Sequence, residues 1–281
     1  MAQEKPSTLS YITQIAITIG VLYCVYSFFP FHLIPQSIAE TENGIEAAAQ
    51  ASAAENKVQD AVVIELFTSQ GCYSCPPAEA LLRKLSQRPD VIALEFHVDY
   101  WDDLVYGFSG KWQDRFSSPK ATTRQADYNL KFRGKPNGYT PQVVLNGQIE
   151  TVGTRANSIN TAIKSLKTTR QSSLTVTPTV TPQGDLNVAL NTLDLPGHPQ
   201  ILFVRFIKRK ETKVTSGENM GKTLTSYNIA KEWFTLNSWN RKTTDVHKKI
   251  PPLKDNEGCA VLVQDRKTHA IHAAGFCRPA T

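Results

Sequence analysis

The chain has 281 residues, of which 41% are hydrophobic and 20% are charged. This balance is typical of globular proteins and excludes a generally disordered chain. The net charge of +6 is spread over the whole length instead of being concentrated on one element, which argues against a nucleic-acid-binding protein.

The first forty residues differ in composition from the rest. Residues 6–39 contain no Asp, Glu, Lys or Arg, and an almost continuously apolar run within them ends at Pro30. This run is long enough to cross most of a bilayer, so we expect residues 1–39 to be a signal anchor, a transmembrane helix that stays attached. A cleaved signal peptide is the alternative. Lys5 precedes the run and no Lys or Arg follows it before Lys57, which puts the bulk of the chain outside the cytoplasm, in the periplasm or at the cell surface.

An α/β pattern begins after an Ala-rich linker at residues 40–57. The β-branched, apolar run at residues 61–67 predicts a buried strand, and residues 91–98 predict a second one. Between them, residues 79–87 place their apolar side chains on one face, which predicts a helix. This strand–helix–strand order favours a parallel pair of strands with a right-handed crossover.

A long insertion separates this unit from a hairpin. Residues 99–138 predict a mostly helical segment. Asn-Gly at residues 146–147, between apolar runs at 142–145 and 149–152, is a strong signal for a β-hairpin. A closing helix is expected at residues 158–166.

The pattern then changes to short alternating runs separated by turns. Examples lie at residues 186–190, 201–207 and 259–263. We therefore expect an antiparallel β-sandwich-like domain over residues 171–281, following an α/β domain over residues 58–170.

Cys72 and Cys75 lie between the first predicted strand and its helix. The free N–H groups of a helix N-terminus stabilise a thiolate, so Cys72 is the expected nucleophile and Cys75 the expected resolving thiol of a redox pair that needs no cofactor. Pro76 and Pro77 fit the first turn of the helix. One alternative is a structural disulfide without catalytic role. A structural zinc site would need a second ligand pair at metal spacing, so we assign no metal ligand.

Cys259 and Cys277 flank a predicted hairpin in the second half. In an oxidising compartment we expect them to form a structural disulfide, worth about 3 kcal/mol by loop-entropy arguments. Simple hairpin register does not place the two residues directly opposite each other.

The segments ELFTSQGCYSCPPAEALL, FHVDYW and YTPQVVLNG, in this order, resemble a secreted bacterial thioredoxin-like family that is catalogued as a domain of unknown function. The resemblance runs from about residue 62 to the C-terminus and includes SGENMGKTLTSYNIAKEW. It implies that residues 58–170 form a thioredoxin-like domain in which the helical insertion covers the site. The family has no assigned substrate.

The thioredoxin superfamily carries a cis-proline that faces the cysteine pair. Thr140-Pro141 matches this position, so the resemblance implies that Pro141 is cis and part of the catalytic site, and that the backbone of Thr140 contacts substrate. We add Tyr139 and Tyr73 to the expected substrate contacts. Glu65 resembles the buried acid that moves protons at the second cysteine in some members, although strand alternation could turn it away from the pair.

His97 and Trp101 lie at the C-terminal end of the second predicted strand, the edge where open α/β sheets bind ligands. We assign both to a substrate cleft. The alternative is that Trp101 packs under the insertion and that His97 is a core histidine.

These observations predict a membrane-anchored, extracytoplasmic thiol–disulfide oxidoreductase. Its partners would be protein thiols or disulfides, a small thiol, or a reductant or oxidant protein, with the membrane contacted through the N-terminal helix and no nucleic acid bound. One alternative is a copper-binding or copper-delivery module, since thiolates suit Cu(I) and His97 is near, but the chain has only two methionines. The other alternative is a non-catalytic envelope scaffold with a structural disulfide.

Overall fold

The computed structural model describes residues 61–169, 174–195, 197–236, 239 and 241–280. The predicted anchor at residues 1–39 and the linker at 40–57 lie outside this range. Within the described residues, no helix combines the length and the apolar character needed to cross a membrane.

The first half is a mixed α/β structure whose elements are β1 (Val62–Thr68), α3 (Pro76–Ser86), β2 (Val91–His97), η1 (Gly107–Ser109), α4 (Pro119–Arg133), β3 (Gln142–Leu145), β4 (Ile149–Val152) and α5 (Ala156–Thr168). Strand β1 pairs in parallel with β2, and β3 lies antiparallel to both β1 and β4. Every residue of β1 and β2 is buried, as expected for strands covered on both faces.

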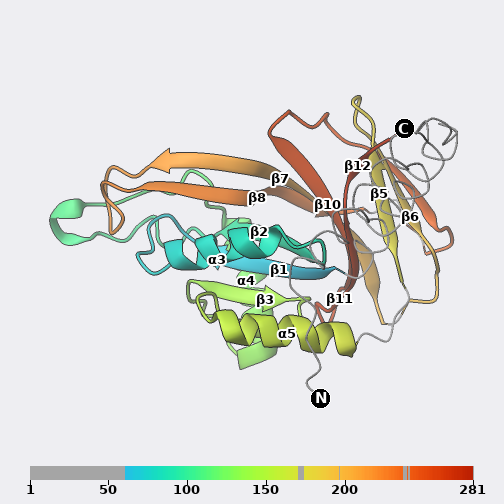
Figure 1. The fold of residues 1–281 in the computed structure, drawn as a ribbon, viewed down its shortest axis with the longest axis horizontal. Coiled ribbons are helices and arrows are strands. Elements are labelled where there is room, and N and C mark those ends of the chain that lie inside the picture. Colours follow the sequence, from blue (N-terminus) through green and yellow to red (C-terminus); the bar gives the residue numbers. More distant parts are fainter. Residues whose placement is uncertain (1–60, 170–173, 196, 237–238, 240, 281) are drawn as a thin grey trace, which may run out of the picture. The chain divides into compact units, whose positions relative to one another are not determined.

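Side-chain alternation along β1 separates two cores. Val62, Ile64 and Leu66 pack with residues of α3 and α5. Val63 and Phe67 belong to a second cluster that includes residues of α4, and Figure 1 shows α3 and α4 on opposite sides of the strands. Because neighbouring side chains of a strand point to opposite faces, each position of β1 faces either α3 or α4, and this decides which of its polar residues can reach the cysteines.

The insertion is less helical than predicted. Within residues 99–118, the described helical structure is the three-residue turn Gly107–Ser109, and α4 begins only at Pro119. Gly107 and Gly110 have φ angles of 51° and 68°, in the left-handed region that a continuous right-handed helix does not use.

The second half extends the sheet of the first. β7 (Pro199–Lys213) and β8 (Thr223–Thr235) form a long antiparallel hairpin, and Ile229 of β8 pairs in parallel with Glu95 of β2. With β10 (Glu257–Asp265) and β11 (Ile271–Phe276), they complete an eight-stranded sheet of order β11-β10-β7-β8-β2-β1-β3-β4 (Figure 1).

A smaller sheet covers one end of this large sheet. It contains β5 (Val176–Val180), β6 (Asp185–Leu190), β9 (Asp245–Lys249) and β12 (Arg278–Pro279), in the order β12-β5-β6-β9. Residues 201–204 of β7 are apolar on both faces because this part of the strand lies between two cores. Ile201 and Phe203 pack with the smaller sheet, whereas Leu202 and Val204 pack with the core that contains Phe67. The boundary expected at residue 171 therefore does not separate two independent cores.

A disulfide joins Cys259 of β10 to Cys277, with Cα atoms 5.2 Å apart. As expected, a simple hairpin register does not place the two residues opposite each other, because the pairing of Gln264 with Ile271, continued along the strands, would put Cys259 opposite Phe276. A register shift between Val263 and Gln264 brings Ala260 opposite Phe276, so the two cysteines are neighbours across the strands.

Candidate functional site

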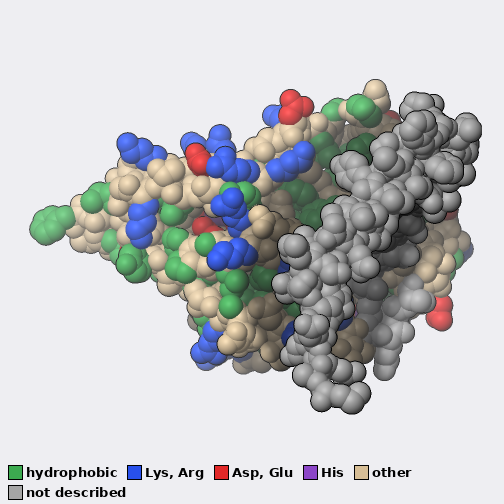
Figure 2. All heavy atoms as spheres, viewed as in Figure 1, with side chains coloured by type: hydrophobic (Ala, Val, Ile, Leu, Met, Phe, Trp, Pro, Cys, Tyr) green, Lys and Arg blue, Asp and Glu red, His purple; other side chains and the backbone are tan. Residues whose placement is uncertain are grey.

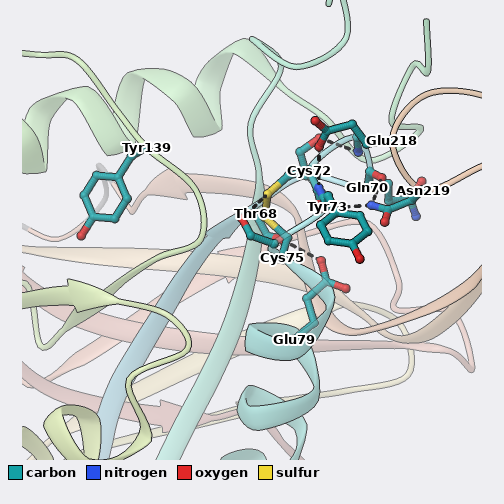
Figure 3. Close-up of a disulfide and its surroundings, with 12 residues drawn as sticks. Thr68, Gln70, Cys72, Tyr73, Cys75, Glu79, Tyr139, Glu218 and Asn219 are labelled. Atoms are coloured by element: carbon teal, nitrogen blue, oxygen red, sulfur yellow. Dashed lines mark hydrogen bonds between the residues drawn. A yellow bond between two sulfur atoms is a disulfide. The ribbon is translucent and has the colours of Figure 1, made fainter. Parts of the chain in front are cut away.

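The second disulfide, Cys72–Cys75, lies in the loop between β1 and α3 (Figure 3). Cys75 is the N-cap residue of α3, and its carbonyl oxygen accepts hydrogen bonds from the backbone N–H groups of Ala78 and Glu79. Both cysteines are 0% exposed, whereas Tyr73 between them is 65% exposed. The pair thus has the position that a redox dithiol needs, at a helix N-terminus, but its sulfur atoms are covered.

Glu79 is a buried acid near the disulfide that the sequence analysis missed. It lies one helical turn after Cys75, on the same face of α3, and accepts a 2.6 Å hydrogen bond from the hydroxyl of Thr68 (Figure 3). Burial and the nearby carboxylate of Glu95 raise the pKa of Glu79 to about 8. Glu79 is therefore mainly protonated at neutral pH. The spacing of four residues from Cys75 was the available sequence signal.

Glu65, the acid that the sequence suggested, has other partners. Its carboxylate accepts a 2.6 Å hydrogen bond from Nε of Arg124 and a further one from the hydroxyl of Tyr128, both in α4. Glu65 shares the face of Val63, opposite to that of Thr68. The alternation of the strand thus turns Glu65 away from α3 and toward an ion pair with α4.

His97 belongs to a buried polar network. Its Nδ1 lies 2.7 Å from Asp114 and its Nε2 lies 3.5 Å from Glu95. Burial lowers the pKa of His97, but the two carboxylates outweigh burial and raise the pKa well above its ordinary value. The same oxygen of Asp114 accepts a 2.7 Å hydrogen bond from the backbone N–H of Gln70. His97 thus contributes to holding the loop before Cys72 and, being 1% exposed, does not face a cleft.

The remaining expected site residues have different surroundings. The Cβ of Trp101 would lie 3.3 Å from a Cβ placed on Gly71, and the Trp101 ring stacks on Tyr106 within the insertion. The hydroxyl of Tyr139 donates a hydrogen bond to Glu150, and its ring points away from the disulfide in Figure 3. The peptide bond between Thr140 and Pro141 is cis, which is the form that the resemblance implied.

A groove of about 380 Å³ runs between α3 and the start of β8. Pro76, which directly follows Cys75, lies at the groove together with Glu79, Arg83 and Lys84. Figure 2 shows that Lys and Arg side chains outnumber acidic ones on the visible face of the described residues. The groove therefore presents positive charge next to the disulfide.

Comparisons with known proteins agree with this architecture. The model of a family described as "Protein of unknown function (DUF1223)" matches residues 63–264. The crystal structure of protein AGR_C_4864 from Agrobacterium tumefaciens is 28% identical in sequence, covers 76% of this chain and 92% of its own, and has a TM-score of 0.62. HBP35 of Porphyromonas gingivalis is 12% identical, with coverages of 78% and 74% and a TM-score of 0.51, so this likeness concerns the fold alone. No curated protein matches the chain.

Proposed function

We propose that this chain, which belongs to the DUF1223 family, is an extracytoplasmic thiol–disulfide oxidoreductase. The observation that carries the proposal is the Cys72–Cys75 disulfide at the N-terminus of α3, with the protonatable carboxyl of Glu79 one turn further along the same helix. A structural disulfide needs no such acid beside it.

The reaction begins when a thiolate of the partner attacks Sγ of Cys72. The Cys72–Cys75 bond breaks, a mixed disulfide forms, and Cys75 leaves as a thiolate that takes the proton of Glu79. A second thiolate of the partner then attacks the partner's sulfur in the mixed disulfide and releases Cys72. Two electrons pass to the cysteine pair, and the partner's two thiols become a disulfide. The reverse sequence reduces a partner's disulfide.

Several contacts support Cys72 as the cysteine that reacts with the partner. Its Sγ lies 3.3 Å from the hydroxyl of Ser74, which can donate to a Cys72 thiolate. Tyr73 and Ser74, which follow Cys72, are both exposed. The parallel β1–α3–β2 unit, the antiparallel β3 and the cis bond before Pro141 support a thioredoxin-like fold, in which Pro141 and the backbone of Thr140 would contact the substrate.

Surface charge supports the proposed kind of partner, and the disulfides support the proposed compartment. The positive groove beside Cys75 can bind an acidic segment of a protein or small thiol. The two disulfides support an oxidising, extracytoplasmic compartment. Attachment through residues 1–39, or release after cleavage, remains part of the proposal.

The copper-delivery alternative receives no comparable support. The ring nitrogens of His97 face Asp114 and Glu95. Within the part of the chain that the structure describes, no three His, Cys, Asp or Glu side chains gather in a way that could hold a metal ion.

The test is oxidation of a reduced, unfolded protein such as ribonuclease by the oxidised full-length chain. We expect the loss of ribonuclease thiols to be faster with the wild type than with Cys72→Ser. With disulfide-bonded ribonuclease as the substrate, Cys75→Ser should accumulate a mixed disulfide, seen on a non-reducing gel, because Cys72 attacks a ribonuclease disulfide and no resolving thiol remains. Equal rates for wild type and Cys72→Ser, and no mixed disulfide, would refute the proposed function.

A further inference from the structure

The turn between β7 and β8 lies against the redox centre. We call residues 214–222 the hairpin tip and residues 69–75 the redox loop. About 150 residues separate them in the sequence, yet Figure 3 shows Glu218 and Asn219 beside Gln70, Cys72 and Tyr73. The hairpin tip includes the segment SGENMGK, to which the sequence analysis gave no role.

Asn219 makes the central contact. It is 0% exposed, and its Nδ2 donates hydrogen bonds to the carbonyl oxygens of Gln70 at 2.9 Å and of Cys72 at 3.0 Å. One side chain of the hairpin tip thus fixes the backbone on both sides of Gly71. A buried amide that bridges two buried carbonyl groups is costly to displace, because all three groups would lose their partners.

Two charged residues of the hairpin tip flank this amide. Oε2 of Glu218 accepts a 2.8 Å hydrogen bond from the backbone N–H of Tyr73. Nζ of Lys222 donates to Oδ1 of Asn219 at 2.9 Å and lies 4.2 Å from the centre of the Tyr73 ring. The residue that follows the nucleophilic cysteine is therefore held through both its backbone and its ring.

These contacts affect access to the disulfide. A thiolate must approach the attacked sulfur along the S–S axis, but Cys72 and Cys75 are both 0% exposed. The redox loop must therefore shift before a partner can react. Because Asn219 and Glu218 bind its backbone directly, the shift requires their hydrogen bonds to break.

The contacts also affect the balance between disulfide and dithiol. A Cys72 thiolate would be stabilised by nearby N–H donors, and the N–H group of Tyr73 is already bound to a carboxylate. The negative charge of Glu218 also repels a thiolate. Glu218 therefore favours the oxidised pair.

We propose that Asn219 and Glu218 are positioning residues of the redox centre. Asn219 holds the redox loop closed over the oxidised pair, and Glu218 stabilises the disulfide relative to the dithiol. This inference rests on the proposed function for its biological meaning, since the two residues control a pair that exchanges electrons. The effects of Asn219 and Glu218 on the reactivity of the Cys72–Cys75 disulfide can be measured without knowing the partner.

The experiment measures reduction of the oxidised full-length chain by dithiothreitol, with alkylation and mass spectrometry of the peptide that contains both cysteines. Asn219→Ala should raise the second-order rate constant by about tenfold, as expected when two hydrogen bonds to backbone carbonyls are lost. Met220→Ala is the matched control, because Met220 belongs to the same tip but is 54% exposed. Its rate should stay within about twofold of wild type.

Glu218→Gln tests the charge without removing the acceptor oxygen. We expect the equilibrium with glutathione to move toward the dithiol by several-fold, because the repulsion of the thiolate is lost. If Asn219→Ala does not fold, the glutathione equilibrium of Glu218→Gln alone tests the proposal.

The proposal is overturned if Asn219→Ala reacts at the wild-type rate, if Met220→Ala accelerates the reaction equally, or if Glu218→Gln leaves the glutathione equilibrium unchanged. The proposed function is tested separately, by ribonuclease oxidation. Dithiothreitol results as predicted, with no oxidation of ribonuclease, would refute the proposed function and leave this inference standing.

Discussion

Two acids illustrate how chemistry at the redox pair depends on single residues. Glu65 and Glu79 are both fully buried near the cysteine loop, but Glu65 is paired with Arg124 whereas Glu79 hydrogen-bonds to the neutral hydroxyl of Thr68. For Glu79, burial and the nearby carboxylate of Glu95 raise the pKa to about 8, which outweighs the lowering effect of His97. We infer that Glu79, and not Glu65, moves the proton of Cys75.

Glu79→Gln should therefore slow the reduction of the disulfide by a thiol. At pH 7 the rate per thiolate should fall by about tenfold or more, because Cys75 loses its proton donor. In the wild type, the rate per thiolate should decline as the pH rises through about 8, where Glu79 ionises. The variant should lack this decline. Stopped-flow measurements from pH 6 to 10 check both results, and a decline that persists in Glu79→Gln would contradict the assignment.

The same pKa makes a prediction for stability. The pKa of Glu79 is about 8 in the folded chain and close to 4.5 in the unfolded one, so the folded state binds the proton more tightly. Its contribution to stability is fully present below about pH 4.5 and is lost as the pH rises through about 8. Urea unfolding should show Glu79→Gln gaining on the wild type between pH 5 and 8 and keeping a constant difference above. A difference independent of pH would contradict the buried, protonated carboxyl.

At the scale of single residues, part of the redox site could be predicted from the sequence. The Cys72–Cys75 spacing was readable because it depends on one strand and one helix. The choice between Glu65 and Glu79 was partly readable, since strand and helix periodicity decide which face each residue takes. Asn219 could not be found, because its contact with Cys72 depends on the path of a hairpin 147 residues away.

At the scale of elements, close turns hold the two halves together. Asn146, in the turn between β3 and β4, donates its backbone N–H to Val63 and accepts from the N–H of Ile271 at the start of β11. Gly147, which follows, has a φ angle of 62°. A Cβ at Gly147 would lie 1.9 Å from the carbonyl oxygen of His269. The Asn-Gly signal predicted the turn, but nothing in it predicted the neighbouring backbone.

Gly147→Ala should therefore lower the free energy of unfolding by about 3 kcal/mol or more, because both the backbone conformation and the neighbouring carbonyl oppose a side chain. Gly134→Ala is the matched control. Gly134 also has a positive φ angle, of 68°, but a Cβ there would meet nothing within 4 Å. Its cost should be about 1 kcal/mol. If urea unfolding shows that both variants lose the same free energy of unfolding, the close approach to His269 does not contribute to the cost of Gly147→Ala.

At the scale of the whole described chain, the sheet unites segments that the sequence assigned to separate domains. Strand β8 pairs in parallel with β2 through Glu95 and Ile229, and the side chain of Asn228 donates a hydrogen bond to the carbonyl oxygen of Ala93; no local sequence pattern reveals this pairing. The core that contains Phe67 and Phe96 also contains Leu202 and Trp233 from the second half. The apolar run at residues 201–204 was the available hint, since apolar and polar residues would alternate along a strand at the surface of a sandwich.

The chain from residue 58 should consequently unfold as one cooperative unit. We expect urea transitions followed by tryptophan fluorescence and by circular dichroism to coincide. A fragment of residues 58–170 should aggregate, because β2 would lose the strand at its edge and Phe96 its contact with Trp233. Two separate transitions, or a soluble and folded fragment, would show that the first half is an independent domain.

The reduction potential of Cys72–Cys75 tests the central claim most directly. The full-length chain is equilibrated in glutathione buffers, and alkylation followed by mass spectrometry of the peptide that carries the pair separates its signal from that of Cys259–Cys277. Cys72→Ser serves as the control without a disulfide at this site. We predict a reversible transition between about −120 and −270 mV, the range of working thiol–disulfide catalysts. A potential below about −300 mV, or the absence of a transition, would identify the bond as structural and contradict the oxidoreductase account.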